Sequence, residues 1–381
     1  MTSGNAGKKQ NQYRILQLLW KEGTLTRQDI AQKLNLSMPT TLQNTNELLE
    51  YGILQECGAM ESTGGRRAKK LVLNENFGLG LGIDIALQHV ELVITNLHGR
   101  VMIQDTLPLI FRDEIEWYHA FQQGLHTFLH DNDVETARII GAGLSFPGII
   151  DGEAEQIIRS HIFQLEHVSL DRFKKCIPFP LIAANDANCV CFAERSVEHT
   201  TYLYLSLNES VGGAMMLDSR LELGDTWQKG EIGHMLLFPG GKQCYCGKHG
   251  CADPYLSPNA LRKEGQSLDD FFMKVEQGDV DSCKRWDEYM DHLAIMVTNL
   301  RMLCDEDIII GGVVGTYMKP YMEQLNAKAA QYDRFARDVD YIYPCTRKTH
   351  AFAAGASMIA MERYGSRLLD DNMLMKLRKK S

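Results

Sequence analysis

Apolar and polar positions form two different patterns along the chain, which divide it near residue 75. Before that point, apolar side chains recur at helical spacing in three short runs, and each run predicts a short helix. The apolar residues are Ile15, Leu18 and Leu19 in the first run, Ile30, Ala31 and Leu34 in the second, and Leu48 and Leu49 in the third. We therefore expect three helices between Asn11 and about Tyr51.

Capping residues mark where these helices begin and end. Thr26 precedes the second helix, and Asp29 follows three positions later in an acidic variant of the capping box. Asn35 is expected to end that helix, and Ser37 to cap the third, whose first turn tolerates Pro39. Two short helices joined by a tight turn, the second rich in Thr, Gln and Asn, are typical of a helix-turn-helix that binds the major groove.

Two strand-like runs, residues 53–57 and 69–73, follow the helices and flank a loop with the pairs Gly64–Gly65 and Arg66–Arg67. A hairpin here would make the unit a winged helix-turn-helix. Residues 1–70 hold ten Lys or Arg and six Asp or Glu, which gives them a net charge of +4. The net charge of the whole chain is −9, so the remaining residues carry −13. This asymmetry favours DNA as the partner of the basic unit over the alternative, another protein.

Four residues of this unit are candidates for DNA contact. Gln43 is expected to pair with adenine, and Thr40 to contact phosphate. Arg66 would enter the minor groove or bind phosphate, and Arg67 stands beside it. The alternative for this arginine pair is a solvated loop.

The pattern leaves the buried face of the third helix open. Thr41, Asn44 and Thr45 would make a poor apolar stripe. Leu42 is therefore either a core residue or a contact for a thymine methyl group.

From Gly78 onwards, strand-like and helix-like runs alternate. Three strand-like runs precede a helix at about 113–130, and new cycles begin at Ile139 and Pro180. Later runs predict a largely helical region at 257–303, a strand at 307–310 and a helix at 350–365. Repeated cycles of this kind predict a multi-layer α/β body with clefts at the strand ends.

Three cysteines, Cys244, Cys246 and Cys251, form a C-x-C-x4-C array ten residues after His234. Neighbouring glycines allow tight turns, so these side chains can converge as the four soft ligands that zinc prefers. Ordinary buried thiols or a disulfide are the alternatives. No run of about 18 apolar residues and no apolar signal core appear, so we expect a cytoplasmic protein without a membrane partner. Thiols stay reduced there, which favours metal binding.

Seven motifs carry a resemblance to a known family. They are the GGRR wing, Pro147–Gly148, NDAN at 185–188, GEIGH at 230–234, CxCGxxGC at 244–251, IIIGG at 308–312 and AAGA at 353–356. On these motifs the chain resembles the ROK family, which joins sugar kinases and sugar-responsive repressors, and within it the transcriptional-regulator branch. The resemblance implies an α/β chain with a winged helix-turn-helix at 1–75. It also implies a sugar-binding body at 76–381 with an actin-like (ribonuclease H-like) ATPase fold, whose small lobe spans about 78–188 plus the C-terminal helix and whose large lobe spans about 189–350.

The resemblance assigns roles to residues of the body. The ligands of a structural zinc ion would be His234, Cys244, Cys246 and Cys251. Asp186, preceded by Asn185, matches the family's catalytic aspartate, which accepts a proton from a sugar hydroxyl. Glu231 and His234 match sugar contacts, and Asp253 stands where the family has a longer glutamate. The alternative for Asp186 is a helix cap.

Two departures from the family's kinases argue against phosphoryl transfer, and a third, at Ile162, concerns the ligand that the pocket accepts. The kinase motif D-x-G-G-T-K is replaced at 84–89 by DIALQH, whose bulky side chains would occupy the approach of phosphate. Glu209, in the second phosphate loop, would repel an anion. Ile162 replaces an asparagine that holds a sugar hydroxyl, and His161 or His167 are candidates to take over its role. We therefore expect a protein that is not an enzyme.

The predicted function is a transcriptional regulator, in the first place a repressor. It would bind operator DNA as a homodimer or dimer of dimers, and a sugar or sugar phosphate would release or modulate it. One alternative is an ATP-dependent sugar kinase with an appended DNA-binding domain. The other is a constitutive DNA-binding or scaffold protein with an inactive pocket.

Overall fold

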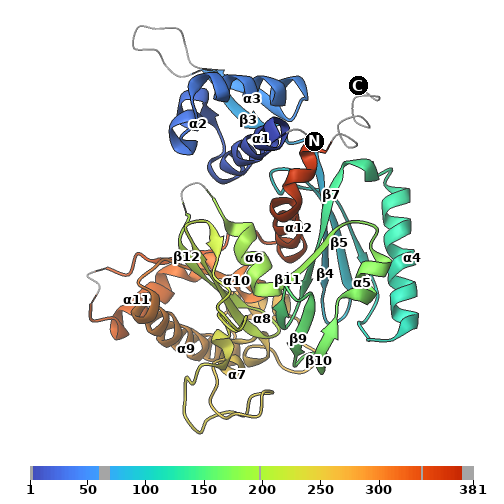
Figure 1. The fold of residues 1–381 in the computed structure, drawn as a ribbon. Coiled ribbons are helices and arrows are strands. Elements are labelled where there is room, and N and C mark those ends of the chain that lie inside the picture. Colours follow the sequence, from blue (N-terminus) through green and yellow to red (C-terminus); the bar gives the residue numbers. More distant parts are fainter. Residues whose placement is uncertain (1–2, 60–68, 197–198, 336–337, 371–381) are drawn as a thin grey trace.

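The computed structural model describes residues 3–59, 69–196, 199–335 and 338–370. A helical N-terminal head sits on a two-lobed α/β body (Figure 1). This confirms the predicted fold class. Among the helices of the described residues, none is both long and apolar enough to cross a membrane.

The head combines three helices with an antiparallel sheet of strand order β1-β3-β2. Its elements are α1 (Ser3–Glu22), β1 (Leu25–Thr26), α2 (Arg27–Leu34), α3 (Met38–Glu50), β2 (Leu54–Ala59) and β3 (Lys69–Leu73). Helix α1 begins well before Asn11, where we expected it to start. Its added turns carry small and polar residues, which give no periodic apolar signal.

The predicted caps fix the turn between α2 and α3. Thr26 Oγ1 accepts a hydrogen bond from Asp29 N at 3.2 Å, and Asp29 Oδ2 accepts one from Thr26 N at 2.9 Å. Asn35 ends α2 in the left-handed conformation, with φ 51°. Ser37 Oγ then accepts from Thr40 N at 3.3 Å and starts α3.

The buried face of α3 is polar. Thr41, Asn44 and Thr45 are at most 2% exposed, and Leu48 is fully buried beside them. Each of the three polar side chains donates to the carbonyl oxygen four residues earlier, at 2.8–3.1 Å, so its donor group is satisfied locally, although Asn44 Oδ1 is buried without a partner among the described residues. Leu42 is 42% exposed and is therefore not a core residue.

The first lobe of the body is built on a sheet of strand order β11-β7-β4-β5-β6. Its strands are β4 (Leu79–Ile85), β5 (Val90–Asn96), β6 (Val101–Leu107), β7 (Ile139–Phe146) and β11 (Leu181–Asn185). The remaining elements are α4 (Ile115–Asp131), α5 (Asp171–Cys176) and a small sheet of β8 (Ile149–Asp151), β9 (Gln156–Ser160) and β10 (Leu165–Ser169). Helix α4 covers one face of the main sheet, and α12 (Ala351–Tyr364) covers the other (Figure 1).

The second lobe has a sheet of strand order β14-β13-β12-β15-β16. Its strands are β12 (Tyr202–Leu207), β13 (Val211–Leu217), β14 (Arg220–Leu221), β15 (Ile308–Gly311) and β16 (Ile342–Pro344). Its helices are α7 (Asp253–Leu256), α8 (Leu268–Glu276), α9 (Val280–Cys304), α10 (Gly312–Gly315) and α11 (Met322–Tyr332). These helices and the sheet enclose the largest apolar core of the described residues.

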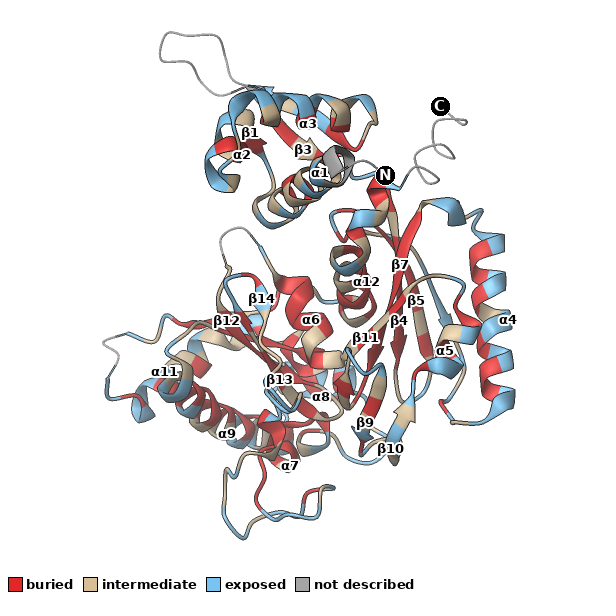
Figure 2. Ribbon diagram, in the orientation of Figure 1, coloured by how far each residue is buried: buried red, intermediate tan, exposed pale blue. Residues whose placement is uncertain are grey.

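Helix α12 packs against both the first sheet and α6 (Asp186–Glu194), and it is largely buried (Figure 2). Two glycines permit this close approach. A Cβ atom on Gly143 of β7 would lie 1.9 Å from the carbonyl oxygen of Ala356, and one on Gly355 would lie 1.8 Å from that of Cys189 in α6. Since backbone packs directly on backbone, α6 and α12 are tightly fixed to each other.

Helix α1 joins the head to the body. Its apolar residues share one core with Leu97, Met361 and Leu368 of the body. Trp20 Nε1 donates to the carbonyl oxygen of Leu97 at 3.0 Å, and Tyr13 OH donates to that of Glu362 at 3.1 Å. The head is therefore packed against the body rather than tethered to it.

Candidate ligand pocket and metal centre

A pocket of about 50 Å³ lies where α6 begins. The residues that line it include Asn185, Asp186, Glu231, His234, His161, Ile162 and Tyr245. Four of the five predicted ligand-binding residues thus line one cavity, although they are widely separated in the chain. The fifth, Asp253, is not among the lining residues.

The turn from β11 into α6 separates the roles of Asn185 and Asp186. Asn185 caps the helix, because its Oδ1 accepts from Asn188 N at 3.2 Å. Its Nδ2 donates to the carbonyl oxygen of Gly148 at 3.0 Å. Asp186 is the first residue of α6, and burial raises the pKa of its carboxyl group. The cap is therefore Asn185, which leaves Asp186 facing the pocket.

Glu231 precedes a short 3-10 helix, η2 (Ile232–His234), and His234 is its last residue. Their side chains lie 3.8 Å apart, measured from Glu231 Oε2 to His234 Nε2. Partial burial and the nearby Asp186 raise the pKa of Glu231, whereas burial, Lys248 and His161 lower the pKa of His234. A neutral imidazole and a carboxyl group that protonates readily can both exchange hydrogen bonds with sugar hydroxyls.

His234 joins the pocket to a cluster of three thiols. Its ligand atom and those of Cys244, Cys246 and Cys251 all lie within 4.8 Å of one another. His234 Nδ1 is 3.6 Å from Cys244 Sγ, and Cys246 Sγ is 3.8 Å from Cys251 Sγ. A tetrahedral zinc site with metal–sulfur bonds of about 2.3 Å has edges of about 3.6–3.8 Å. The four side chains therefore fit a tetrahedral metal, with His234 Nε2 left on the pocket side.

The side chain of Asp253 is buried and forms a hydrogen bond within the protein. Its side chain is 5% exposed, and its Oδ2 accepts from Val211 N at 2.7 Å. Burial raises the pKa of this carboxyl group to about 6. Its contact supports Val211, which lines the pocket.

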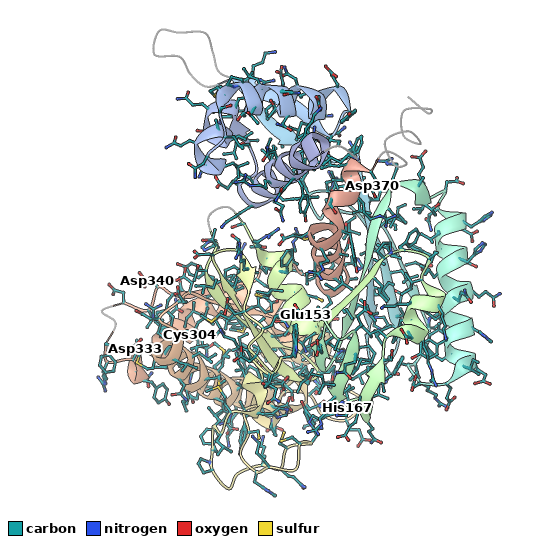
Figure 3. All side chains as sticks on the ribbon, viewed as in Figure 1. Glu153, His167, Cys304, Asp333, Asp340 and Asp370 are labelled. Carbon is teal, nitrogen blue, oxygen red and sulfur yellow. The ribbon has the colours of Figure 1, made fainter. Side chains whose placement is uncertain are left out.

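Two further residues, Tyr245 and His161, line the pocket beside the predicted ligand contacts. Tyr245 had no assigned role, yet its hydroxyl lies 3.3 Å from His234 Nε2. Its position between two ligating cysteines was the available signal. Of the two histidines considered as replacements for the missing asparagine, His161 lines the pocket, with its ring 6.1 Å from that of His234. His167 is exposed on β10 and does not line the pocket (Figure 3).

A second, larger cleft of about 500 Å³ adjoins the pocket and shares Ile162 and Asp186 with it. Residues 84–89, predicted to occupy the approach of phosphate, line this cleft and leave it open. Glu209 pairs with Arg262 at 2.6 Å, so its charge is partly neutralised. Asp84 and Glu91 also line the cleft, together with Lys348 and His350, and Glu91 pairs with His350.

The candidate DNA-binding residues of the head differ in how exposed their side chains are. Gln43 is exposed on α3, whereas Thr40 is half-buried with its hydroxyl 2.8 Å from that of Ser37. Arg66 and Arg67 lie outside the described residues. Helix α3 lies on the side of the head that is remote from the body (Figure 1).

Comparisons with known proteins agree with this architecture. The ROK family profile matches residues 80–363, and a winged helix-turn-helix DNA-binding profile matches residues 8–55. The chain therefore belongs to the ROK family. It is 25% identical to a xylose repressor of Bacillus spizizenii over 310 residues, which cover 77% of this chain and 79% of that protein. It is also 23% identical to the transcriptional dual regulator NagC of Escherichia coli over 270 residues, 68% of this chain and 66% of NagC.

Solved structures share the fold. A ROK family transcriptional regulator, homologous to the E. coli MLC protein, aligns over 97% of this chain and 99% of its own, with a TM-score of 0.79 and 20% identity. A ROK glucokinase from Streptomyces griseus aligns over 75% of this chain and all of its own, with a TM-score of 0.65 and 18% identity. A winged head on a sugar-kinase-like body is thus the architecture of a ROK-family transcriptional regulator.

Proposed function

We infer that this chain is a repressor whose affinity for operator DNA changes when it binds a sugar or sugar phosphate. The observation that carries the proposal is the shared core between α1 of the head and the end of α12 in the body. A ligand that moves α12 must move the head, because buried contacts and the hydrogen bond from Tyr13 to Glu362 join them.

The proposed route starts at the pocket. Asp186 lines the pocket and is the first residue of α6. The backbone of α6 packs directly on the backbone of α12 at Gly355. Helix α12 continues into η5 (Gly365–Leu369), against which Trp20 of α1 is packed. Lobe closure on a ligand would therefore change the angle between the two heads of a dimer. Such a ligand weakens DNA binding only if it binds the non-operator geometry more tightly.

The proposed ligand contacts are Asn185, Asp186, Glu231 and His234, as predicted, with Tyr245 and His161 added from the pocket lining. Asn185 uses its Oδ1 to cap α6 and one N–H of its Nδ2 to bond Gly148. Its contact with the ligand would therefore be made by the second N–H of Nδ2 or by the second lone pair of Oδ1. Asp253 is proposed to act indirectly, through the backbone of Val211. Domain boundaries near residues 75 and 188 remain those of the sequence prediction.

The proposed cofactor is one structural zinc ion held by His234 and the three cysteines. Four protein ligands fill a tetrahedral shell, so the ion would have no open position for catalysis. Its role would be to orient the His234 ring, whose Nε2 faces Glu231 and Tyr245.

The proposed partners are operator DNA and a second copy of the chain, since paired heads match a two-fold operator. We place the protein in the cytoplasm, where operator DNA is found. One feature supports a regulator over the kinase alternative, namely the loss of the glycine-rich phosphate motif at 84–89.

Two linked measurements test the proposal. DNA binding by the full-length protein should weaken steeply with salt, and binding that is independent of salt would rule out the head as a DNA-binding unit. A thermal shift panel of pentoses, hexoses, N-acetylhexosamines and their phosphates should give one sugar that raises the melting temperature. That sugar should also weaken DNA binding. A sugar that stabilises the protein without changing DNA affinity would refute the coupling.

A further inference from the structure

The large apolar side chains exposed on the described part of the head lie on one helix. They are Met38, 43% exposed, and Leu42, 42% exposed, both on α3. These two positions are four residues apart, so their side chains are neighbours on the surface of the helix and could be covered by one partner. Neither side chain contributes to the core of the head.

These two residues belong to one continuous face of α3. The exposed positions of its first two turns are Met38, Pro39, Leu42, Gln43 and Asn46. We name these five residues the reading face. Their spacing of one, three, one and three places them on the side opposite the buried Thr41, Thr45 and Leu48.

The reading face has no basic residue, and α3 as a whole contains no Lys or Arg. The nearest described arginine, Arg27 of α2, is engaged within the head. It donates from Nε to Thr45 Oγ1 at 3.1 Å and from Nη2 to Asn46 Oδ1 at 3.1 Å, and it lies 3.6 Å from Glu56. The described part of this face therefore lacks the fork of donors that reads guanine O6 and N7.

An A·T pair offers the complementary surface in the major groove. Adenine presents N7 and N6, which a glutamine side chain bonds through both of its polar atoms, and thymine presents a C5 methyl group that favours apolar contact. Gln43 stands next to Leu42 on the reading face, so one helix can meet both features of the same or adjacent pairs.

We propose that α3 selects A·T base pairs, with Gln43 bonding adenine and Leu42, supported by Met38, packing on thymine methyl groups. This inference rests on the proposed function, because it requires the head to bind operator DNA. It adds the base composition at the positions that α3 contacts. It also assigns to Leu42 a sequence-specific role that needs no hydrogen bond.

The first experiment selects binding sites for the full-length protein from a random-sequence DNA duplex library. The inference expects A·T pairs at the half-site positions where a 7-deazapurine, which lacks the major-groove N7 atom, weakens binding. Enriched sites with G·C pairs at those positions would overturn the inference and leave the DNA-binding function standing. If no duplex is enriched, the DNA-binding function itself fails, and the inference fails with it.

The second experiment removes single methyl groups by replacing each thymine of a selected half-site with deoxyuridine. At one or two positions the wild-type protein should lose about fourfold in affinity, the equivalent of exposing one methyl-sized group at ~0.8 kcal/mol. The same replacement should leave the affinity of Leu42→Ala unchanged. Val280→Ala is the matched control, since Val280 is 82% exposed on α9 of the body, and it should respond as the wild type does.

Two outcomes of this cycle would overturn the inference. One is a wild-type affinity that does not change with any thymine replacement. The other is a methyl effect that persists at full size in Leu42→Ala. The melting temperature of Leu42→Ala should match that of the wild type, because Leu42 lies outside the core; a folded variant is thereby verified before its DNA affinity is interpreted.

Discussion

The contact between Trp20 and Gly365 offers a direct test of the coupling between head and body. A Cβ atom on Gly365 would lie 2.5 Å from Cζ3 and 2.7 Å from Cη2 of the Trp20 ring. Gly365 has φ −59°, which any residue adopts, so Gly365→Ala introduces only this clash. Overpacking of this kind destabilises by about 1–3 kcal/mol. We expect a loss in that range, measured by urea denaturation of the full-length protein.

Trp20→Phe removes the ring atoms that would clash, together with the N–H donor to Leu97. Alone, it leaves a buried carbonyl oxygen without that partner and should cost about 1–3 kcal/mol. Combined with Gly365→Ala, it should cost at least about 0.5 kcal/mol less than the sum of the two single changes, because the clash is gone. Gly7→Ala on the same helix is the control, since its Cβ would meet no atom within 4 Å. Strict additivity of Trp20→Phe and Gly365→Ala would refute this packing.

Three further predictions follow from the body. Cys246→Ser should lose bound zinc, measured by elemental analysis, and should lose the sugar response together with the metal. Cys283→Ser is the control, because Cys283 lies outside the cluster, and this variant should keep both. A full sugar response in a protein without metal would show that metal binding and the sugar response are independent. Burial raises the pKa of Asp84 from 3.8 to about 8, so between those values the unfolded chain releases a proton that the folded protein keeps. Stability should therefore fall as pH rises through this window, by up to about 1.4 kcal/mol per unit, and Asp84→Asn should reduce this dependence in urea titrations, most clearly above the pKa of about 6 of Asp253. Incubation with ATP and a panel of hexoses should give no more ADP than Asp186→Asn does, and turnover that depends on Asp186 would support the kinase alternative.

Features that depend on neighbouring residues could be predicted from the sequence. The capping box of Thr26 and Asp29 and the left-handed Asn35 are determined within one turn of helix. The three cysteines are close in the chain, so their glycine-rich spacing was enough to predict that they meet His234. The two-lobed fold came from the family resemblance, which the comparisons and the fold bear out.

Features that depend on distant residues could not be predicted. The buried face of α3 was left open because its threonines look solvent-exposed by type, although each satisfies its hydroxyl within the helix. Asp253 appeared to be a ligand contact by position, but its carboxylate accepts from Val211, 42 residues earlier. The packing of Trp20 on Gly365 joins residues from opposite ends of the chain, and no local pattern encodes such a contact.

The shared core between α1 and the C-terminal part of the body has a consequence for synthesis. The head leaves the ribosome first, but Met361, Leu368 and Leu369, which complete its core, are made more than 300 residues later. A nascent chain therefore has an unfinished head until translation is almost complete. Fragments that end early would expose Trp20 and Tyr13, which contact Gly365 and Glu362 in the complete chain, and would be substrates for proteolysis. Under the proposed function, only chains that carry the complete body would therefore occupy the operator with a finished head.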